Sequence, residues 1–510
     1  MKLYSYKQIQ EIESASLAAA GRTPAQLDIT LGAEAAEAIA EVLDECRCRP
    51  VFFAGPGRCG AITLAAAKNL ASKTSHRPQV YFFNVRGTSA SADAVAQRDA
   101  YIAECGAESL EEVTGRFSMP ELSSRDLVVD GLFGSEVEGP LGGAYQALVR
   151  LINESGARIV AIDMPSGLPA DSASGLINRN IIHADLTLAI GMPRLAFFVG
   201  DNAELVGDWQ ILDAGYSREV MAQMAAGYVL IERKQVRHIL PSRNPDTSKA
   251  DYGSLIIFAG SFGMMGAAQL ATRAALRSGA GKVTCHSPRC GYYVMQTATP
   301  EALFDADTCD LYIRDFELKK NYSAVAIGPG MGTNDATVDA LEAFLKVANA
   351  NSRPLVLDAD ALNCIAIRPT LLDYVPVMSV ITPHAGEFDR IFGQQPGADA
   401  RLAKAIEVAM FHKIFIVLKG HITAVVRPDG KVCFNPTGTV ALATAGTGDV
   451  LTGLIAGLMA QGIRSEFAAS AGVYIHGLAG QMAEKTHGAY GVTAGDVADN
   501  IGKAIKSIMN

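Results

Sequence analysis

The chain has 510 residues, of which 49% are hydrophobic and 19% are charged, and its formal net charge is −9. At about 150 residues per domain this length predicts two to four domains, and the apolar content excludes global disorder. The acidic balance argues against nucleic acid and against an anionic membrane surface as partners, so any phosphate site must be a local feature.

The start of the chain and its cysteines indicate a reducing compartment. Residues 1–16 contain no apolar run, so we expect neither a secretory signal nor an amino-terminal membrane anchor. The nine cysteines include no CxxC pair. The apolar stretch 441–462 approaches the length of a membrane span, but Asp449 within it would be costly in lipid. We therefore expect a cytoplasmic protein without a membrane partner.

The first half alternates β-rich runs with helix-like stretches, which is typical of parallel α/β domains. Strands are expected at 51–54, 79–84, 126–129 and 159–162. Helices are expected at 33–46, 61–72, 92–104 and 142–154. The pattern predicts a Rossmann-like, doubly wound domain whose ligands lie at the carboxyl ends of its strands.

The alternation stops at about 215–232 and resumes after a turn-rich segment at 243–249. We therefore place the domain boundary close to Gly227, with one domain at 1–227 and a second α/β domain at 228–510. In the second domain, strands are expected at 254–259, 282–286, 324–327, 354–358, 379–382 and 414–419. A hairpin around Arg427-Pro-Asp-Gly430 and a mostly helical remainder are expected to follow.

The strongest single motif is Ala445-Gly-Thr-Gly-Asp449, which precedes an apolar helix at 450–458. Its glycines let successive backbone N–H groups point into one concavity at a helix N-terminus, where an anion is stabilised. The Asp449 carboxylate beside it can accept a proton from a hydroxyl while the amides stabilise a transferring phosphoryl group. The alternative is that Asp449 only caps the helix, as aspartate often does.

Four further segments with small or polar residues follow predicted strands, at 260–268, 328–332, 358–363 and 382–387. Because the carboxyl ends of parallel strands meet at one edge of a sheet, these segments should form one rim. Together with 445–450 they closely resemble the dehydratase domain of the NAD(P)H-hydrate repair enzymes, a branch of the ribokinase-like fold. The resemblance extends from about Lys249 to Ile501.

The resemblance implies a lyase that uses ADP to dehydrate the S form of hydrated NADH or NADPH, releasing the reduced cofactor, AMP and phosphate. It makes Asp449 the base at the ring hydroxyl. The residues implied to contact the hydrated nucleotide are Ala267, Gly332 and His384. Those implied to contact ADP are Lys419, Gly420, His421, Ile422, Thr423, Gly446 and Gly448.

Phosphoryl transfer also implies Mg²⁺, for which Asp358, Asp360 and Glu387 are possible ligands. Asp358 and Asp360 could instead be turn or cap residues. His384 could be a hydrogen-bonded loop histidine.

In the first half, a strand is followed by the turn Gly55-Pro-Gly57 and a helix, which is a weak signal by itself. Asp130 and Asp163 each follow a further predicted strand. Residues 1–215 resemble the epimerase domain of bifunctional repair enzymes, an isomerase that interconverts the R and S hydrates. The resemblance implies a substrate site at Asp163, Gly134, Glu138 and Gly139, and a K⁺ site at Cys59, Asp130 and Ser166.

The sequence departs from that family directly after the turn. Two asparagines, two glycines and an aspartate are usual there, but this chain has Arg58-Cys-Gly-Ala-Ile62. A thiol at Cys59 is a poor ligand for a hard alkali cation. Arg58 is expected to bring a positive charge close to the cation site and to oppose K⁺. The epimerase half could therefore be degenerate and kept for packing, regulation or assembly.

The leading hypothesis is a bifunctional enzyme whose partners are NAD(P)H-hydrate and ADP. A second hypothesis is a small-molecule kinase of the same fold that phosphorylates an alcohol with ATP, because the Gly-Thr-Gly-Asp arrangement serves that chemistry equally well. A third is that the first half binds a nucleotide or protein without catalysis. The resemblance also suggests a homo-oligomer.

Overall fold

The computed structural model describes residues 1–510 except 86–89, 138–140, 172–179 and 201. The chain forms two compact units. The amino-terminal unit comprises Leu3–Ala226 and Gly397–Asp399. The carboxy-terminal unit comprises Met1–Lys2, Gly227–Pro396 and Ala400–Asn510.

The amino-terminal unit is built on a sheet with the order β4-β3-β2-β5-β6-β7-β8, in which every strand pair is parallel. The strands are β2 (Arg49–Ala54), β3 (Gln79–Phe83), β4 (Leu110–Val113), β5 (Asp126–Gly131), β6 (Arg158–Ile162), β7 (Leu186–Ile190) and β8 (Asp208–Leu212). The order reverses between β2 and β5, and such a reversal opens a crevice at the carboxyl ends of the two strands.

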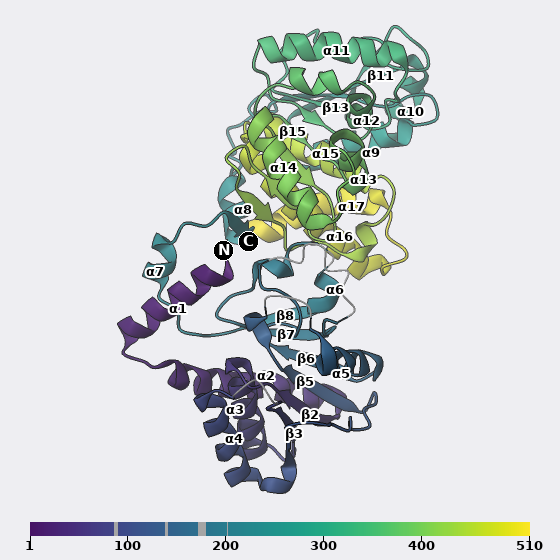
Figure 1. The fold of residues 1–510 in the computed structure, drawn as a ribbon. Helices are drawn as coiled ribbons and strands as arrows, with labels where there is room; N and C mark the ends of the chain where they lie inside the picture. Colours follow the sequence, from purple (N-terminus) through teal and green to yellow (C-terminus); the bar gives the residue numbers. More distant parts are fainter. Residues whose placement is uncertain (86–89, 138–140, 172–179, 201) are drawn as a thin grey trace. The chain divides into compact units, whose positions relative to one another are not determined.

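Helices cover both faces of this sheet (Figure 1). The helices of this unit are α1 (Tyr6–Ala20), α2 (Pro24–Cys46), α3 (Arg58–Lys73), α4 (Ala92–Cys105), α5 (Gly143–Glu154), α6 (Ala203–Val206) and α7 (Arg218–Gln223), of which α1 and α7 stand away from the sheet. Alternate residues of β2 point to opposite faces. Phe52 packs with the core side chains of α2, α3 and α4, whereas Phe53 packs with those of α5. The predicted strands and helices are present, although α2 begins at Pro24 and not at the predicted residue 33. The elements β4, β7, β8, α1, α6 and α7 were not predicted.

The described strands of the carboxy-terminal unit form one sheet with the order β1-β9-β18-β17-β16-β15-β14-β13-β10-β11-β12. They are β1 (Lys2–Leu3), β9 (Tyr228–Leu230), β10 (Ser254–Phe258), β11 (Lys282–Ser287), β12 (Leu303–Ala306), β13 (Ala324–Ile327), β14 (Val356–Leu357), β15 (Val380–Ile381), β16 (Phe415–Leu418), β17 (Ala424–Val426) and β18 (Val432–Phe434). The predicted hairpin is the antiparallel pair β17–β18. The chain start joins this unit, because the Met1 amino group donates to Leu230 O at 2.8 Å.

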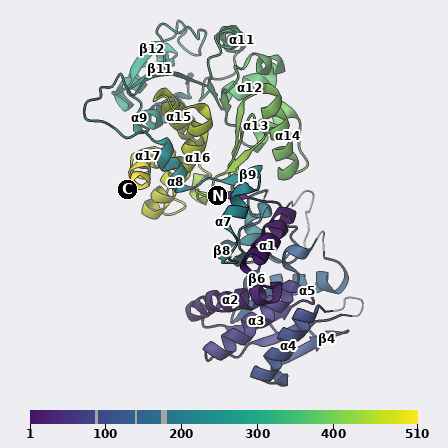
Figure 2. The same cartoon turned by 90° about the vertical axis from the view of Figure 1, so that its left-hand side faces the viewer.

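The helices of this unit lie along two sides of the sheet (Figure 2). They are α8 (Arg233–Ile239), α9 (Met265–Arg277), α10 (Tyr292–Ala298), α11 (Asp335–Ala350), α12 (Asp360–Ile367), α13 (Ala385–Phe392), α14 (Ala398–His412), α15 (Thr447–Ala460), α16 (Ser465–His487) and α17 (Ala494–Met509). Helix α15 is a core helix that packs closely on α9. A Cβ at Gly453 would lie 1.9 Å from Ala271 O, so only glycine permits this approach. In the described part of the chain, no helix combines the length and the apolar character that crossing a membrane requires.

The strand order of the carboxy-terminal unit reverses at β10, which lies between β11 and β13. The turns after β10 and β13 are bonded to each other and to the strands: Gly260 N donates to Pro329 O at 2.8 Å, and Gly328 N donates to Phe258 O at 3.0 Å. The crevice expected at such a reversal therefore lies at the rim formed by the glycine-rich segments.

Candidate active sites

The loop before α15 leaves part of its amides available, although Thr447 N donates to Thr444 O at 3.3 Å. Gly446 is the N-cap residue, with φ +90°, and no side chain caps the helix within the described residues. Thr447 Oγ1 donates to Leu442 O at 2.9 Å, and the buried His476 ring bonds through Nε2 to Thr447 O at 2.9 Å. Burial lowers the pKa of His476 to about 4, so this ring is neutral at pH 7 and Nε2 donates. First-turn amides without a side-chain cap favour an anion.

Asp449 lies in the first turn of α15, and its ionisation is shifted toward neutrality. Burial is the largest cause and the nearby Asp358 carboxylate the next, and together they raise its pKa to about 7, although Lys419 opposes the shift. Because Gly446 holds the N-cap position, the alternative that Asp449 only caps the helix is not supported. A carboxylate with this pKa suits a general base.

Lys419, at the end of β16, places a positive charge against this loop. Its Nζ donates to Asp358 Oδ1 at 3.0 Å and lies 3.9 Å from Glu387 Oε2. A Cβ at Gly448 would be 3.3 Å from Nζ, so the ammonium group touches the loop. Burial opposes the charged form, but the neighbouring carboxylates raise the pKa of Lys419, which therefore stays protonated. Thr452 Oγ1 donates to Asp358 Oδ2 at 2.6 Å and so orients the partner of Lys419.

The residues implied to contact the hydrated nucleotide lie at the same rim. His384 forms a β-bridge with Lys419, and its Nδ1 accepts from Gly386 N at 3.0 Å, so it caps α13 while its ring stays half exposed. Gly332 N donates to Asp360 Oδ2 at 2.9 Å. A Cβ at Gly330 would lie 2.9 Å from Ala267 Cβ, which places Ala267 beside the 328–332 turn. The remaining residues implied for ADP, 420–423, form the turn between β16 and β17 next to Lys419.

The three carboxylates considered for Mg²⁺ already have protein partners. Asp358 binds Lys419 and Thr452, Asp360 accepts from Gly332 N, and Glu387 Oε2 accepts from His384 N at 2.9 Å. In the described residues, no group of three or more His, Cys, Asp or Glu side chains is arranged to hold a metal ion. These residues therefore do not fit a dedicated Mg²⁺ site. In proteins that act on nucleotides, Mg²⁺ is usually held largely by the nucleotide phosphates.

In the amino-terminal unit, Asp163 is held rigidly at the wall of a cavity. The cavity has a volume of about 530 Å³, and Asp163, Glu136, Arg194, Arg58, Cys59 and Tyr6 are among its lining residues. Asp163 Oδ2 accepts from Ser135 N at 2.8 Å, and Oδ1 pairs with Arg194. Asp163 has φ +67°, and a Cβ at Gly134 would lie 2.9 Å from its Oδ2, so Gly134 adjoins it as expected. Glu138 and Gly139 lie outside the described residues.

Two of the three side chains implied for K⁺ offer oxygen atoms, and the third does not. Asp130 is fully buried; its Oδ2 accepts from Ser166 N and its Oδ1 from Ser166 Oγ, both at 2.7 Å. Cys59 is also buried, and its Sγ donates to Ile162 O at 3.3 Å. Burial raises the pKa of this thiol well above its ordinary value, so it stays neutral. The set therefore does not fit an alkali cation at Cys59.

Arg58 has two carboxylate partners that the sequence did not predict. Its Nη1 pairs with Glu13 Oε1 at 2.6 Å, and its Nε pairs with Asp28 Oδ1 at 2.7 Å. These two carboxylates offset the guanidinium charge, which lessens the repulsion expected for K⁺. The three side chains form an ion-pair cluster that ties α3 to α1 and α2.

Sequence reasoning missed Arg194 and Thr452. Arg194 is 3% exposed, and besides Asp163 it binds Ser135 Oγ at 2.9 Å. It follows the carboxyl end of β7, so a charged residue just after that strand could have drawn attention to it. Thr452 offers no such signal, because it lies inside an apolar helix.

Each unit thus presents glycine turns and buried acidic side chains at the carboxyl edge of a mainly parallel sheet, and the second unit adds a glycine-rich loop at a helix N-terminus beside Lys419. This combination defines a two-domain α/β protein whose second domain has a site suited to a nucleotide. The family described as NAD(P)H-hydrate dehydratase matches residues 255–503, and the family described as YjeF-related protein N-terminus matches residues 25–196.

Curated relatives match across both domains. The bifunctional NAD(P)H-hydrate repair enzyme Nnr of Thermofilum pendens is 32% identical over 466 residues, which cover 89% of this chain and 87% of the relative. The enzyme of the same name from Coxiella burnetii is 30% identical over 501 residues, covering 97% of both chains. The chain belongs to the family of bifunctional NAD(P)H-hydrate repair enzymes. The predicted resemblance and the predicted fold, a Rossmann-like domain followed by a ribokinase-like α/β domain, are confirmed.

Among solved structures, the ADP/ATP-dependent NAD(P)H-hydrate dehydratase of Bacillus subtilis, co-crystallised with ATP and Mg²⁺, is similar to the second domain. It is 33% identical, with a TM-score of 0.49, and the match covers 55% of this chain and 98% of that one.

Proposed function

We propose that this chain repairs hydrated NADH and NADPH in the cytoplasm with two activities. The carboxy-terminal domain, at 228–510, dehydrates the S hydrate and converts ADP into AMP and phosphate. The amino-terminal domain, at 1–227, interconverts the R and S hydrates. A homo-oligomeric state stays a prediction from the family resemblance. The observation that supports the dehydratase proposal most directly is the position of Lys419 against the loop that ends in Asp449.

In the proposed reaction the side chains and the loop amides have separate roles. The amides of Gly446 and Gly448 and the Lys419 ammonium hold the phosphates of ADP, where Mg²⁺ bound with the nucleotide would offset further negative charge. Asp449 accepts the proton of the ring hydroxyl as that oxygen takes the terminal phosphoryl group and AMP leaves. Phosphate is a better leaving group than hydroxide. The C–O bond therefore breaks with the help of the electron pair on the ring nitrogen, and loss of a ring proton restores the dihydronicotinamide.

Replacement of Asp449 tests this assignment. Asp449→Asn should retain ADP binding but lose dehydration by about 10²–10⁴-fold, the usual effect of losing a general base. Recovery of NADH absorbance from the S hydrate measures dehydration, and calorimetric titration measures ADP binding. Asp339→Asn, an exposed aspartate on α11, is the matched control. Undiminished turnover in Asp449→Asn would contradict the assignment, and a kinase acting on another alcohol would leave the hydrate unchanged even in the wild type.

For the amino-terminal domain, support comes from the geometry around Asp163. Its two oxygens are bound by Arg194 and Ser135 N, so the carboxylate is fixed at the cavity wall beside Gly134. We propose Asp163 as the residue that acts on the substrate of this domain. Asp130 and Ser166 would be the oxygen ligands if K⁺ binds, and no step is assigned to the ion because Cys59 does not fit it.

A further inference from the structure

A second hollow adjoins the proposed substrate side of the dehydratase site. It has a volume of about 490 Å³ and is lined by Thr333, Asp360, Asn363, Ala366, Ile367 and Arg390. Asp360 links it to Gly332, because Gly332 N donates to Asp360 Oδ2 at 2.9 Å. Nothing in the chemistry assigned above to the dehydratase site uses Arg390.

A continuous chain of hydrogen bonds sets the orientation of Arg390. Asn363 Nδ2 donates to Asp360 Oδ1 at 2.9 Å, which turns Asn363 Oδ1 toward Arg390. Arg390 Nη1 donates to this oxygen at 2.7 Å, and Nε donates to Gly386 O at 3.1 Å. These hydrogen bonds run from Gly332, which is implied to contact the hydrated nucleotide, to Gly386, two residues after His384.

The charge of Arg390 is left uncompensated by its protein partners. Both acceptors are neutral oxygens, and Arg390 takes part in no ion pair within the described residues. Two nearby arginines differ in this respect: Arg368 pairs with Asp339 and Glu342, and Arg401 pairs with Asp389. A guanidinium held in place without a carboxylate partner is well suited to a phosphate, which it binds with two parallel hydrogen bonds.

We propose that Arg390 binds a phosphate group of the hydrated dinucleotide. The inference rests on the proposed function of this domain. The phosphate is either in the pyrophosphate, which both hydrates carry, or at the adenosine 2′ position, which only the NADPH hydrate carries. The Asp360 carboxylate lies on the far side of Asn363, so it repels a phosphate at its own end of the hollow and favours the end at Arg390.

The test compares Arg390→Gln with the wild type in steady-state dehydration of both hydrates at saturating ADP. The KM should rise about tenfold, the equivalent of one charge-assisted contact, with kcat little changed. A rise for both hydrates identifies the pyrophosphate, and a rise for the NADPH hydrate alone identifies the 2′-phosphate. Arg390→Lys, which keeps the charge but not the planar guanidinium group, should have a KM between those of the wild type and Arg390→Gln. Arg277→Gln, an exposed arginine on α9, is the control and should leave KM unchanged.

A KM that stays the same for both hydrates in Arg390→Gln would overturn the proposal, as would a loss confined to kcat. Direct titration of NADH and NADPH, followed by their fluorescence, separates this outcome from failure of the proposed function. Suppose that the wild type leaves both hydrates unchanged, but Arg390→Gln binds NADPH more weakly than the wild type does. The phosphate site then stands and the dehydratase proposal falls. If the wild type neither turns over the hydrates nor binds either reduced cofactor, both proposals fall.

Discussion

At the residue scale, the protonation of Asp449 depends on its surroundings more than on its chemical type. Burial disfavours its charged form, and Asp358, Asp360 and Glu387 add negative charge around it, whereas Lys419 supplies the opposing positive charge. The result is a pKa of about 7 in place of the ordinary 3.8. A carboxyl group with this pKa is only partly protonated near neutral pH, so it can still accept a proton from the substrate.

This pKa predicts the pH dependence of dehydration. Only the carboxylate form of Asp449 can accept a proton, so kcat/KM for the S hydrate should be constant above about pH 7 and fall roughly tenfold per unit below it. Initial rates at constant ionic strength measure the profile of the free enzyme. Asp449→Asn should lose this acidic limb in whatever activity is left. A wild-type profile that rises as the pH falls below neutrality would be incompatible with Asp449 as the base.

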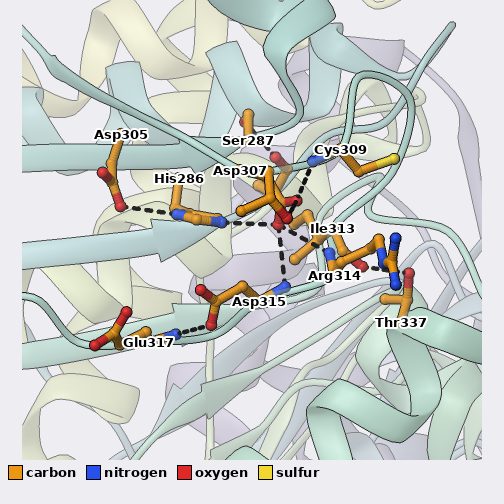
Figure 3. A network of polar contacts seen from close by, with 12 residues as sticks. His286, Ser287, Asp305, Asp307, Cys309, Ile313, Arg314, Asp315, Glu317 and Thr337 are labelled. Carbon is orange, nitrogen blue, oxygen red and sulfur yellow. Dashed lines mark hydrogen bonds and ion pairs between the residues drawn. The ribbon is translucent and has the colours of Figure 1, made fainter.

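At the element scale, the segment after β12 is folded around one buried carboxylate (Figure 3). Asp307 accepts from Cys309 N at 2.7 Å, Arg314 N at 2.8 Å and Asp315 N at 3.1 Å, and the His286 ring lies 3.2 Å away through Nε2. The same segment reaches the turn after β10, because Phe262 N donates to Leu311 O at 2.8 Å. Burial opposes the charged form, but these hydrogen bonds outweigh it and lower the pKa of Asp307 to about 2.

We therefore expect Asp307→Asn to destabilise the carboxy-terminal unit by about 3 kcal/mol at pH 7, because the amide turns a donor toward backbone N–H groups. The lowered pKa of Asp307 also sets how stability depends on pH. The charged carboxylate contributes about 2 kcal/mol to the free energy of unfolding, and this contribution is complete above about pH 4 and is lost as the pH falls toward 2. Urea unfolding between about pH 3 and pH 7 measures the free energy of unfolding of both proteins. The difference in this free energy between wild type and variant should become smaller in acid. Asp310→Asn, exposed in the same segment, is the control. A difference that widens in acid would refute the role of this charge.

At the scale of the whole molecule, each unit has its own sheet, its own reversal of strand order and its own acidic site. Asp163 is fixed by Arg194 and Ser135, and Asp449 is surrounded by residues of the carboxy-terminal unit. No side chain named at one site belongs to the other unit, so the two activities should be separable in the full-length chain.

Single substitutions in the full-length chain test this separation. Asp163→Asn should abolish conversion of the R hydrate to the S hydrate and leave dehydration of the S hydrate within about twofold of wild type, whereas Asp449→Asn should do the reverse. Chromatography of the two hydrates with time measures both activities. An equimolar mixture of the two variants should again consume the R hydrate, because the S hydrate diffuses from one site to the other. Loss of S dehydration in Asp163→Asn would show that the sites are coupled.

The order of elements and the glycine-rich turns could be predicted from the sequence, because both follow from local patterns. A strand or helix is recognised by the period of its apolar residues, and a turn such as 445–449 by glycines and an acid within five positions. Parallel strands then place the turns at one edge, so Gly332 and His384 were expected at the same rim. Asp449 was singled out by its glycine-rich turn, and Lys419 only by the family resemblance. The strands missed in the first half include β4, which lies at the edge of its sheet and is largely exposed.

By itself, then, the sequence determined the two α/β domains, their family and the rim on which the dehydratase residues lie. Only the tertiary structure decided which charges face each other: Arg58 with Glu13 and Asp28, Asp358 with Lys419, and Arg390 with no carboxylate partner among the described residues. The physical reason is that ion pairing, burial and the pKa shifts they cause depend on distances in space. Folding sets those distances between residues such as Asp358 and Thr452, which are 94 positions apart along the chain.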